Sequence, residues 1–178
     1  MKIVIIRHAE VDFSWNGKST SDMFDSDCIG YDSASIKEIK YRIPLIAYKR
    51  IYISELSRTG DTAKILFPDR DYIVSGLINE VPLRSSFDTQ KKMPLWLWNF
   101  SGRLQWFVNS ARQTEGRNKT RERAGRFVTM ITNENIDCAI VTHGFFMHTL
   151  LSEMKKAGFR TNISSVAYKN GEYVVAER

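Results

Sequence analysis

The sequence predicts an α/β fold, a three-layer sandwich in which helices cover both faces of a mostly parallel central sheet and a small helical cap is inserted. Three short apolar runs, at residues 3–6, 51–53 and 138–142, indicate its strands. Continuous runs of this kind, bounded by polar residues, are typical of strands buried on both faces of a parallel sheet. Segments with helical spacing follow them, which favours an α/β arrangement.

After the first run the chain is polar and irregular as far as residue 32. Loops that follow strand ends commonly line the pocket of such a sheet, so Trp15 and Asn16 are candidate substrate-binding residues. The alternative for Trp15 is packing beneath its own loop. Residues 33–42 are then predicted to form a helix with isoleucines facing inward, and Pro44 ends the pattern.

The run at 51–53 leads into a second predicted helix. Serines precede Arg58 and can act as N-caps, which places this arginine in the first turn of the helix. Pro68 ends the helix. A further short strand is predicted at 71–75, and the loop after it carries Glu80.

A cap-like insertion is predicted at about 85–116. It contains an apolar stripe with helical spacings of four, four, three and four, while Trp98 and Trp106 lie off that stripe. One interpretation is a face that packs against the core. The other is a helical cap over the pocket, whose aromatic residues and Arg103 select the organic part of a substrate. The stripe consists of Trp96, Phe100, Leu104, Phe107 and Ala111.

The net charge is +6 and the pI is about 9.4. The densest basic cluster, at residues 112–126, overlaps a helical pattern, so most of its charges are predicted to form a solvated helix face. No nucleic-acid-binding motif accompanies the charge, and we expect no nucleic-acid partner. We expect the positive field to steer phosphate esters toward the protein. The apolar positions of this helix are Ala124, Phe127, Val128 and Ile131.

The C-terminal part predicts a helix at 145–156 and two strands, at 164–169 and 172–177. Asn170-Gly171 between the strands is typical of a tight hairpin turn. His148 lies about 140° around the helix from the direction of His143, so the pair does not form a helical metal clip. We interpret His148 as structural or surface-exposed and predict no metal site.

The length of 178 residues predicts a single domain, residues 1–178, with a sizeable core. The composition, 43% hydrophobic, excludes disordered and collagen-like classes. No run approaches the roughly 18 apolar residues of a membrane span, so no membrane partner is expected. The first apolar run is too short for a signal peptide, and the two cysteines, Cys28 and Cys138, do not suggest a disulfide framework. We therefore expect a cytoplasmic protein; its oligomeric state is not indicated.

Two buried strands each deliver a histidine at the same kind of position. The first run ends in Arg7 and His8, and the run at 138–142 ends in His143. If these strands are parallel neighbours, both imidazoles face one pocket at the carboxyl edge of the sheet, where α/β proteins bind ligands. Arg58, near free N–H groups at a helix start, would join them. Two arginines and two histidines then converge on one anion.

These residues resemble the histidine phosphatase superfamily, also called phosphoglycerate-mutase-like. The resemblance rests on four short motifs whose order and spacing agree and which span most of the chain. The chain departs from the relatives at residues 31–34, where they have a Gly-containing helix start. We expect that departure to touch only the surface and to leave the chemistry intact. The motifs are Arg7-His8-Ala9-Glu10, Ser54-Glu55-Leu56-Ser57-Arg58-Thr59 with Thr62-Ala63, Leu77-Ile78-Asn79-Glu80, and Thr142-His143-Gly144.

The resemblance implies a role for each site residue. His8 would be the nucleophile, Arg7, Arg58 and His143 would hold the phosphoryl group together with it, and Glu80 would be the acid and base. His143 would become a further donor if its contact with the phosphate protonates it. Glu10 and Glu115 are the competing carboxylates. No cofactor or metal is implied.

The implied function is a metal-independent phosphomonoesterase that forms a phosphohistidine on a small phosphorylated metabolite. Two alternatives remain open: phosphotransfer within one substrate, as in a phosphoglycerate mutase, and a non-catalytic phospho-ligand-binding protein. Mutases are usually longer, and all the core residues of a catalyst are present here. A phosphatase assay would separate the three classes.

Overall fold

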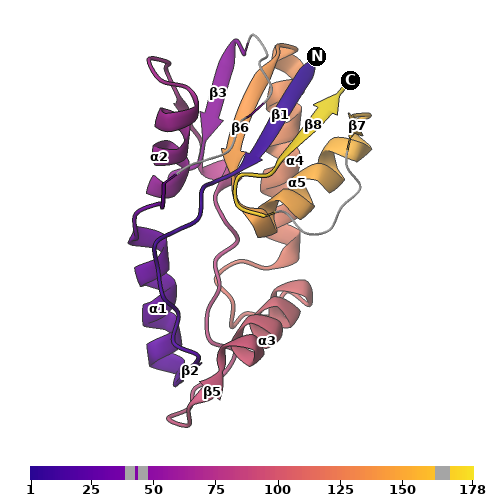
Figure 1. Ribbon diagram of the computed structural model, residues 1–178. Helices are drawn as coiled ribbons and strands as arrows, with labels where there is room; N and C mark the ends of the chain where they lie inside the picture. The colour runs from indigo at the N-terminus through magenta and orange to yellow at the C-terminus, as the bar shows by residue number, and fades with distance from the viewer. Residues whose placement is uncertain (39–42, 44–47, 163–168) are drawn as a thin grey trace.

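The computed structural model describes residues 1–38, 43, 48–162 and 169–178. Its central sheet lies between helices, and the chain ends meet at one end of that sheet (Figure 1). This arrangement confirms the predicted α/β class. The six strands of the sheet are, in spatial order, β4 (Ile73–Val74), β3 (Arg50–Ile53), β6 (Cys138–Thr142), β1 (Lys2–Arg7), β8 (Tyr173–Glu177) and β7 (Arg160–Thr161).

The middle of the sheet is parallel, as predicted. β6 pairs in parallel with β1 on one side and with β3 on the other, and β4 continues in parallel with β3. Residues 3–6 and 139–141 are completely buried, so these strands are apolar on both faces. The register places Arg7 opposite Thr142. His8 and His143, the next residues along each strand, therefore leave the sheet at the same level.

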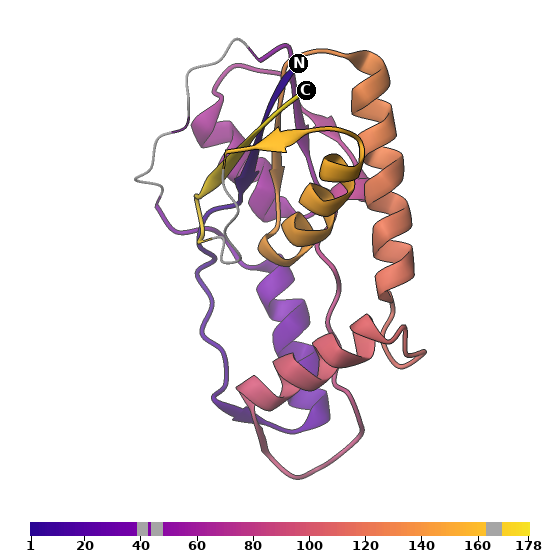
Figure 2. The same cartoon turned by 90° about the vertical axis from the view of Figure 1, so that its right-hand side faces the viewer.

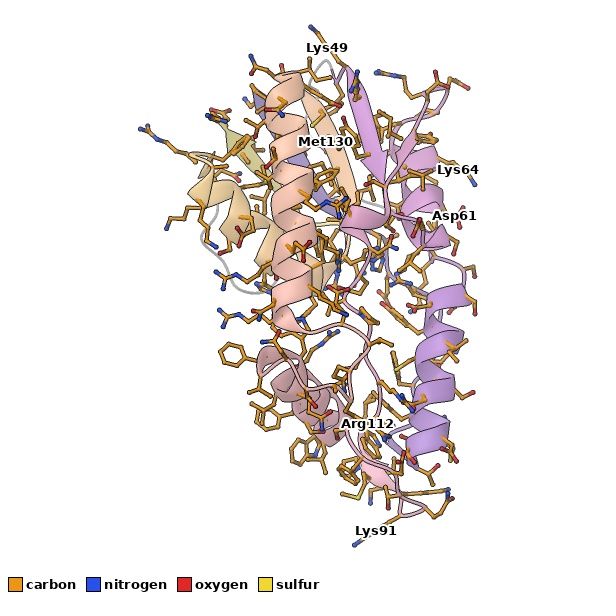
Figure 3. All side chains as sticks on the ribbon, turned by 180° about the vertical axis from the view of Figure 1, so that it is seen from behind. Lys49, Asp61, Lys64, Lys91, Arg112 and Met130 are labelled. Atoms are coloured by element: carbon orange, nitrogen blue, oxygen red, sulfur yellow. The ribbon has the colours of Figure 1, made fainter. Side chains whose placement is uncertain are left out.

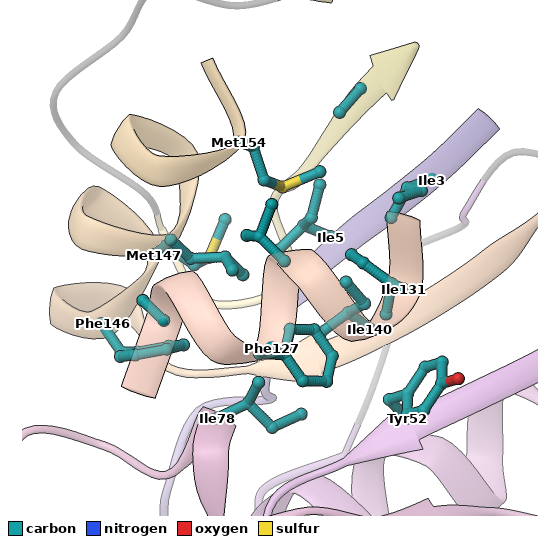
Figure 4. Close-up of a cluster of buried hydrophobic side chains, with 14 of the residues drawn as sticks. Ile3, Ile5, Tyr52, Ile78, Phe127, Ile131, Ile140, Phe146, Met147 and Met154 are labelled. Atoms are coloured by element: carbon teal, nitrogen blue, oxygen red, sulfur yellow. The ribbon is translucent and has the colours of Figure 1, made fainter. Parts of the chain in front are cut away.

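A hydrophobic cluster fills the space on each face of the sheet. On one face, α4 (Arg117–Glu134) and α5 (Gly144–Lys156) contribute Phe127 and Phe146, which pack with Ile5 and Ile140 of the sheet (Figure 4). On the other face, α2 (Ser57–Leu66) contributes Ala63. The four inward positions predicted for α4 are all buried. Among the described residues, no helix is both long and apolar enough to cross a bilayer.

The helix predicted at 33–42 is wrong over its described part. Residues 34–38 are not helical, and Ile36 forms an isolated β-bridge with Val11. Residues 39–42 lie outside the described residues. An isoleucine spacing of three fits a short helix, but residues 35–37 instead pair through backbone hydrogen bonds with residues 10–12, which follow β1.

The first helix, α1 (Ser21–Ser33), lies in the stretch that was predicted to be irregular. Thr20 is its N-cap, and the Thr20 hydroxyl oxygen accepts a hydrogen bond from the Met23 amide at 3.3 Å. Only two residues of α1 are buried, Ser21 and Phe24. A helix with so narrow an apolar face leaves a weak hydrophobic pattern, and its capping residue is the clearer signal.

The cap segment, residues 85–116, lies beyond the carboxyl ends of the parallel strands, on the same side as α1 (Figure 2). It contains β5 (Met93–Pro94) and α3 (Leu95–Phe107). β5 pairs antiparallel with β2 (Lys18–Ser19), which directly precedes α1. This small ribbon ties the cap segment to α1.

The apolar stripe of α3 faces solvent, so its interpretation as a packing face is wrong. Trp96 is 67% exposed and Phe100 is 63% exposed, and rings project outward from α3 (Figure 3). The inward face consists of Trp98, Gly102 and Trp106, which are also spaced by four. At residue 102 a Cβ atom would lie 2.6 Å from a methyl group of the adjoining loop. The prediction relied on the spacing of hydrophobic residues, which does not include glycine, and it therefore assigned the wrong face of α3 to the interior.

The strand predicted at 172–177 is confirmed as β8. β8 pairs antiparallel with β1 on one side and with β7 on the other. Its predicted hairpin partner, 164–169, lies outside the described residues except for Lys169. Gly171 has φ 79°, the left-handed conformation that a tight turn before β8 favours.

Candidate active site

His8 and His143 meet where β1 and β6 end. Their ring centroids are 5.1 Å apart, and the two side chains are almost completely buried. Gly144 allows Arg7 to lie beside them, because a Cβ atom at residue 144 would come within 2.8 Å of Arg7 Nε. The strand ends therefore bring together the two histidines and the arginine that the sequence placed there.

The hydrogen bonding of His8 defines which ring nitrogen is free. His8 Nδ1 lies 2.6 Å from the carbonyl oxygen of Ala9. A carbonyl only accepts, so Nδ1 carries the hydrogen and Nε2 keeps its lone pair. Burial, followed by the positive charges of Arg58 and Arg7, lowers the pKa of His8 from 6.5 to about 3. His8 is therefore neutral at physiological pH, with Nε2 available as a nucleophile.

His143 is oriented by Ser54, which directly follows β3. Ser54 Oγ lies 2.8 Å from His143 Nε2, while Nδ1 is buried with no hydrogen-bond partner among the described residues. Burial, then the neighbouring positive charges, holds the pKa of His143 well below its usual value. When the Ser54 hydroxyl donates to Nε2, Nδ1 of the neutral ring carries the hydrogen and can donate to a ligand. In that arrangement His143 needs no proton from a phosphate to act as a donor.

The role of Ser54 was missed in the sequence, where it was considered only as a helix cap. The N-cap of α2 is Leu56, and no side chain caps this helix. The signal that could have found Ser54 is the one that found the histidines, a polar residue placed directly at the end of a buried strand.

Arg58 lies in the first turn of α2, as predicted, and is completely buried. Its Nη1 donates a hydrogen bond to Asp32 Oδ1 at 2.9 Å, and the Tyr31 ring centroid is 5.1 Å from its guanidinium carbon. Its Nε and Nη2 are buried and have no partner among the described residues. The expectation that residues 31–34 touch only the surface is therefore wrong, because two of them contact Arg58.

Glu80 lies in the loop after the short 3-10 helix η1 (Gly76–Ile78), at the start of α5. Glu80 Oε1 accepts hydrogen bonds from the Val81 amide at 2.8 Å and from the Phe146 amide at 3.0 Å. The second amide belongs to the first turn of α5, where a carboxylate is favoured. Oε1 is thus fixed by the backbone, and Oε2 accepts no hydrogen bond from the described residues.

The competing carboxylates are placed differently. Glu10 is exposed and pairs with Lys37 Nζ at 2.5 Å. Glu115 lines the cavity described below, but its Oε1 accepts a hydrogen bond from Arg123 Nε at 2.9 Å. Among the described residues, Glu80 is the one of these three carboxylates that lines the cavity without pairing with a basic side chain.

A cavity of about 950 Å³ opens between the end of the sheet, α1 and the cap segment. Arg7, Arg58 and Glu80 line it at the sheet end, and Trp15 and Arg103 line it elsewhere. Arg103 donates from Nη1 to the Val81 carbonyl at 3.1 Å and lies 3.8 Å from the Phe145 ring centroid. The exposed aromatic stripe of α3 does not contribute to the lining.

Asn16 is not brought into the cavity. Its Nδ2 donates to both carboxylate oxygens of Asp27 at 3.0 Å, in an exposed position. Besides Glu80, three carboxylates, Asp25, Asp32 and Glu115, line the cavity alongside the arginines. Within the described ranges, no three His, Cys, Asp or Glu side chains are grouped so that they could hold a metal ion.

Residues 3–177 match the family model of the histidine phosphatase superfamily (branch 1). The chain belongs to this superfamily. The match covers nearly the whole sequence, including all four motifs that carried the resemblance. Compared with curated protein sequences, the chain has no significant match.

Solved structures of phosphatases share the histidine phosphatase fold of this chain. A mycobacterial glucosyl-3-phosphoglycerate phosphatase aligns with a TM-score of 0.63 at 14% identity, covering 98% of this chain and 88% of its own. A phosphoserine phosphatase from Entamoeba histolytica aligns with a TM-score of 0.59 at 15% identity, covering 98% and 89%. The α-ribazole phosphatase from Shigella flexneri gives 0.57 at 16% identity, with the same coverages. Identities this low establish the fold alone.

Proposed function

We propose that this protein is a metal-independent phosphomonoesterase that works through a phosphohistidine on His8. The observation that carries the proposal is the contrast between the two sides of the site. His8 presents an unprotonated Nε2, while the adjacent Arg58 and His143 present buried nitrogens that lack partners among the described residues. Buried polar groups are normally hydrogen-bonded. A phosphoryl group placed before His8 Nε2 would supply the missing acceptors.

The first half-reaction forms the phosphohistidine. The lone pair of His8 Nε2 attacks phosphorus, the N–P bond forms, and the ester P–O bond breaks. The departing alkoxide oxygen takes a proton from the Glu80 carboxyl. Arg7 and Arg58 balance the charge on the phosphoryl oxygens as the ester bond breaks, and the Nδ1–H of His143 donates to one of them.

The second half-reaction releases phosphate. The Glu80 carboxylate takes a proton from water, and the water oxygen attacks phosphorus. The P–N bond breaks, its electron pair returns to Nε2, and inorganic phosphate leaves. His8 and Glu80 are then back in their starting protonation states. The positive charges of Arg58 and Arg7 favour the unprotonated form of the released His8, so it can attack the next substrate.

We propose a small phosphorylated metabolite as the substrate. A cavity of about 950 Å³ is large enough for a drug-sized molecule. Trp15 offers an apolar surface to the organic part, and Arg103 offers a cation that is held in place by stacking on Phe145. Cys28 and Cys138 are both free, which suits the reducing cytoplasm that we propose as the location.

A panel of phosphate esters tests the proposal, with released inorganic phosphate as the readout and excess chelator in a parallel set. We expect net phosphate release that survives the chelator, because arginines supply the charge that a divalent ion supplies elsewhere. Transfer within the substrate without release would instead indicate a mutase. Neither release nor transfer across the panel would indicate a phospho-ligand-binding protein. A loss of activity that added metal restores would contradict metal independence.

A further inference from the structure

We propose that Asp32 and Tyr31 are positioning residues that hold the Arg58 guanidinium so that its Nε and Nη2 face the phosphoryl group. This inference rests on the proposed function, since it assigns Arg58 to the phosphate. Both residues lie near the C-terminal end of α1.

The hydrogen bonds divide the guanidinium into two edges. Nη1 donates to Asp32 Oδ1 at 2.9 Å, whereas Nε and Nη2 are buried and have no partner among the described residues. A guanidinium is planar, and its Nε and Nη2 hydrogens point in parallel, which matches two oxygens of a phosphate. Asp32 therefore occupies a part of Arg58 that a bidentate phosphate does not need, and fixing Nη1 fixes the plane of the free edge.

Tyr31 contacts the same guanidinium through the face of its ring. The Tyr31 ring centroid lies 5.1 Å from the guanidinium carbon of Arg58, within the range of a cation–π contact. The ring is itself held by Trp15 and Phe13, at centroid distances of 5.3 Å and 6.0 Å. The hydrogen bond from Nη1 and the contact with the Tyr31 ring together restrict the movement of the guanidinium.

The negative C-terminal end of α1 also favours this position of the Arg58 guanidinium. The C-terminus of a helix carries partial negative charge, and the last turn of α1 contains no basic residue of its own. Arg58 supplies the cation from α2. A carboxylate such as Asp32 is unfavourable in a last turn unless a cation is close, and the Arg58 pair provides that cation. The Asp32 side chain is 50% exposed while Arg58 is completely buried, so the pair contributes more to the orientation of Arg58 than to stability.

The alternative is that Asp32 competes with phosphate for Arg58 and so inhibits the enzyme. A competitor would occupy the edge that binds phosphate, but Asp32 accepts from Nη1 and leaves Nε and Nη2 free. The two ideas predict opposite results when the carboxylate is removed. Loss of a competitor tightens phosphate binding and raises activity, whereas loss of a positioning residue lowers activity.

The experiment compares Asp32→Ala and Asp32→Asn in the full chain. The asparagine oxygen can still accept from Nη1, so Asp32→Asn should stay within about threefold of wild type in kcat/KM, while Asp32→Ala should lose about tenfold, mostly in kcat. The matched control is Asp88→Ala. Asp88 pairs with Arg112 in the cap segment (Arg112 is labelled in Figure 3), so the control removes the same type of ion pair far from the site and should leave kcat/KM unchanged.

Tyr31 is tested in the same way. Tyr31→Phe keeps the ring over Arg58 and should retain activity, whereas Tyr31→Leu should lose kcat severalfold. Urea unfolding of each variant establishes that it is folded under the assay conditions. A Tyr31→Phe variant as inactive as Tyr31→Leu would show that the ring face is not what matters.

Equal activities of wild type and Asp32→Ala would overturn the proposal, and so would a gain in both Asp32 variants, which would indicate a competitor. Equal losses in both would assign the effect to the charge and overturn positioning by the hydrogen bond. Binding of inorganic phosphate, measured by calorimetry, separates this proposal from the function itself. If wild type binds phosphate without hydrolysing any ester, the phosphatase proposal fails, and weaker binding by Asp32→Ala than by Asp32→Asn would still support positioning. No phosphate binding by wild type would overturn both.

Discussion

The end of the sheet and the cap segment form two walls of the same cavity, but they are held in different ways. At the sheet end, three functional side chains are fixed by a short contact: His8 to Ala9, His143 to Ser54 and Arg58 to Asp32. The strands behind them are buried on both faces. The cap helix α3 packs through one face only and exposes the other.

This difference indicates which wall of the cavity carries out the chemical step and which one selects the substrate. Catalysis needs groups held within a fraction of an ångström, and the packed strands provide that precision. Selectivity for the organic part of a substrate needs only a few polar contacts, and α3 supplies Arg103 and Asn99 to the cavity. We therefore expect changes at the sheet end to affect the chemical step, and changes in α3 to affect stability or substrate choice.

The largest effect should come from His8→Ala, which removes the nucleophile. We expect kcat/KM to fall roughly a thousandfold or more, because no other group can form the phosphohistidine. Urea unfolding should show that the variant is still folded. His148→Ala is the matched control, since His148 is an exposed histidine on α5 and should leave activity unchanged. Near-normal turnover in a folded His8→Ala variant would end the assignment of the sheet end as the catalytic wall.

The next largest effect tests the two faces of α3 against each other. Trp98 is completely buried, stacks on Phe24 at 5.6 Å between centroids, and donates from Nε1 to the Ser19 carbonyl at 3.1 Å. Trp98→Ala should lower the free energy of unfolding by about 3–5 kcal/mol. Trp96→Ala, on the exposed face, should change it by less than about 0.5 kcal/mol. Equal losses in urea unfolding would mean that the outer face is covered in solution.

The same contrast explains how much could be predicted from the sequence. A strand buried on both faces requires no prediction of which face points inward. The ends of residues 3–6 and 138–142 were therefore enough to predict that His8 and His143 leave the sheet at the same level. For a helix the inward face must be predicted, and this prediction was wrong for α3, whose inward face contains Gly102. α1 was missed because it buries only two residues, and its Thr20 cap was not considered.

The contacts that tune the site could not be predicted in the same way. Asp32 and Tyr31 reach Arg58 from a helix whose position was wrong, and Ser54 reaches His143 across 89 residues of sequence. Contacts of this kind depend on which elements become neighbours. The nucleophile and its arginines, in contrast, lie within two residues of a strand end or in the first turn of a helix.

A smaller effect should distinguish the acid from the nucleophile at the sheet end. Glu80→Gln should lower kcat/KM about a hundredfold on an alkyl phosphate, whose leaving oxygen must be protonated as it departs. The loss should be clearly smaller on an activated aryl phosphate, which leaves as a stable anion. Glu10→Gln, at the exposed pair with Lys37, serves as the control and should leave both substrates unaffected. Losses of the same size on both substrates would mean that Glu80 only shapes the cavity, and Glu115→Gln would then be tested.

The smallest expected effect is on stability, and it follows from keeping His8 neutral inside the protein. The unfolded chain protonates this histidine near pH 6.5, whereas the folded chain does so only near pH 3. Between these values the unfolded state binds more protons, so the stability that His8 contributes is present above pH 6.5 and is lost as the pH falls toward 3. At pH 5 the loss amounts to about 2 kcal/mol.

Urea unfolding of wild type and His8→Gln at pH 7, 6 and 5 measures this term. Glutamine does not titrate, so the free energy of unfolding should fall less steeply with decreasing pH in the variant, by about 2 kcal/mol over this range. The comparison of slopes removes the fixed cost of the substitution itself. His148→Gln is the control: its pKa is lowered less than that of His8, and the residue is exposed, so it should leave most of the slope in place. Parallel pH dependences in wild type and His8→Gln would show that the sheet end does not hold His8 neutral, and the account of its free Nε2 would then be wrong.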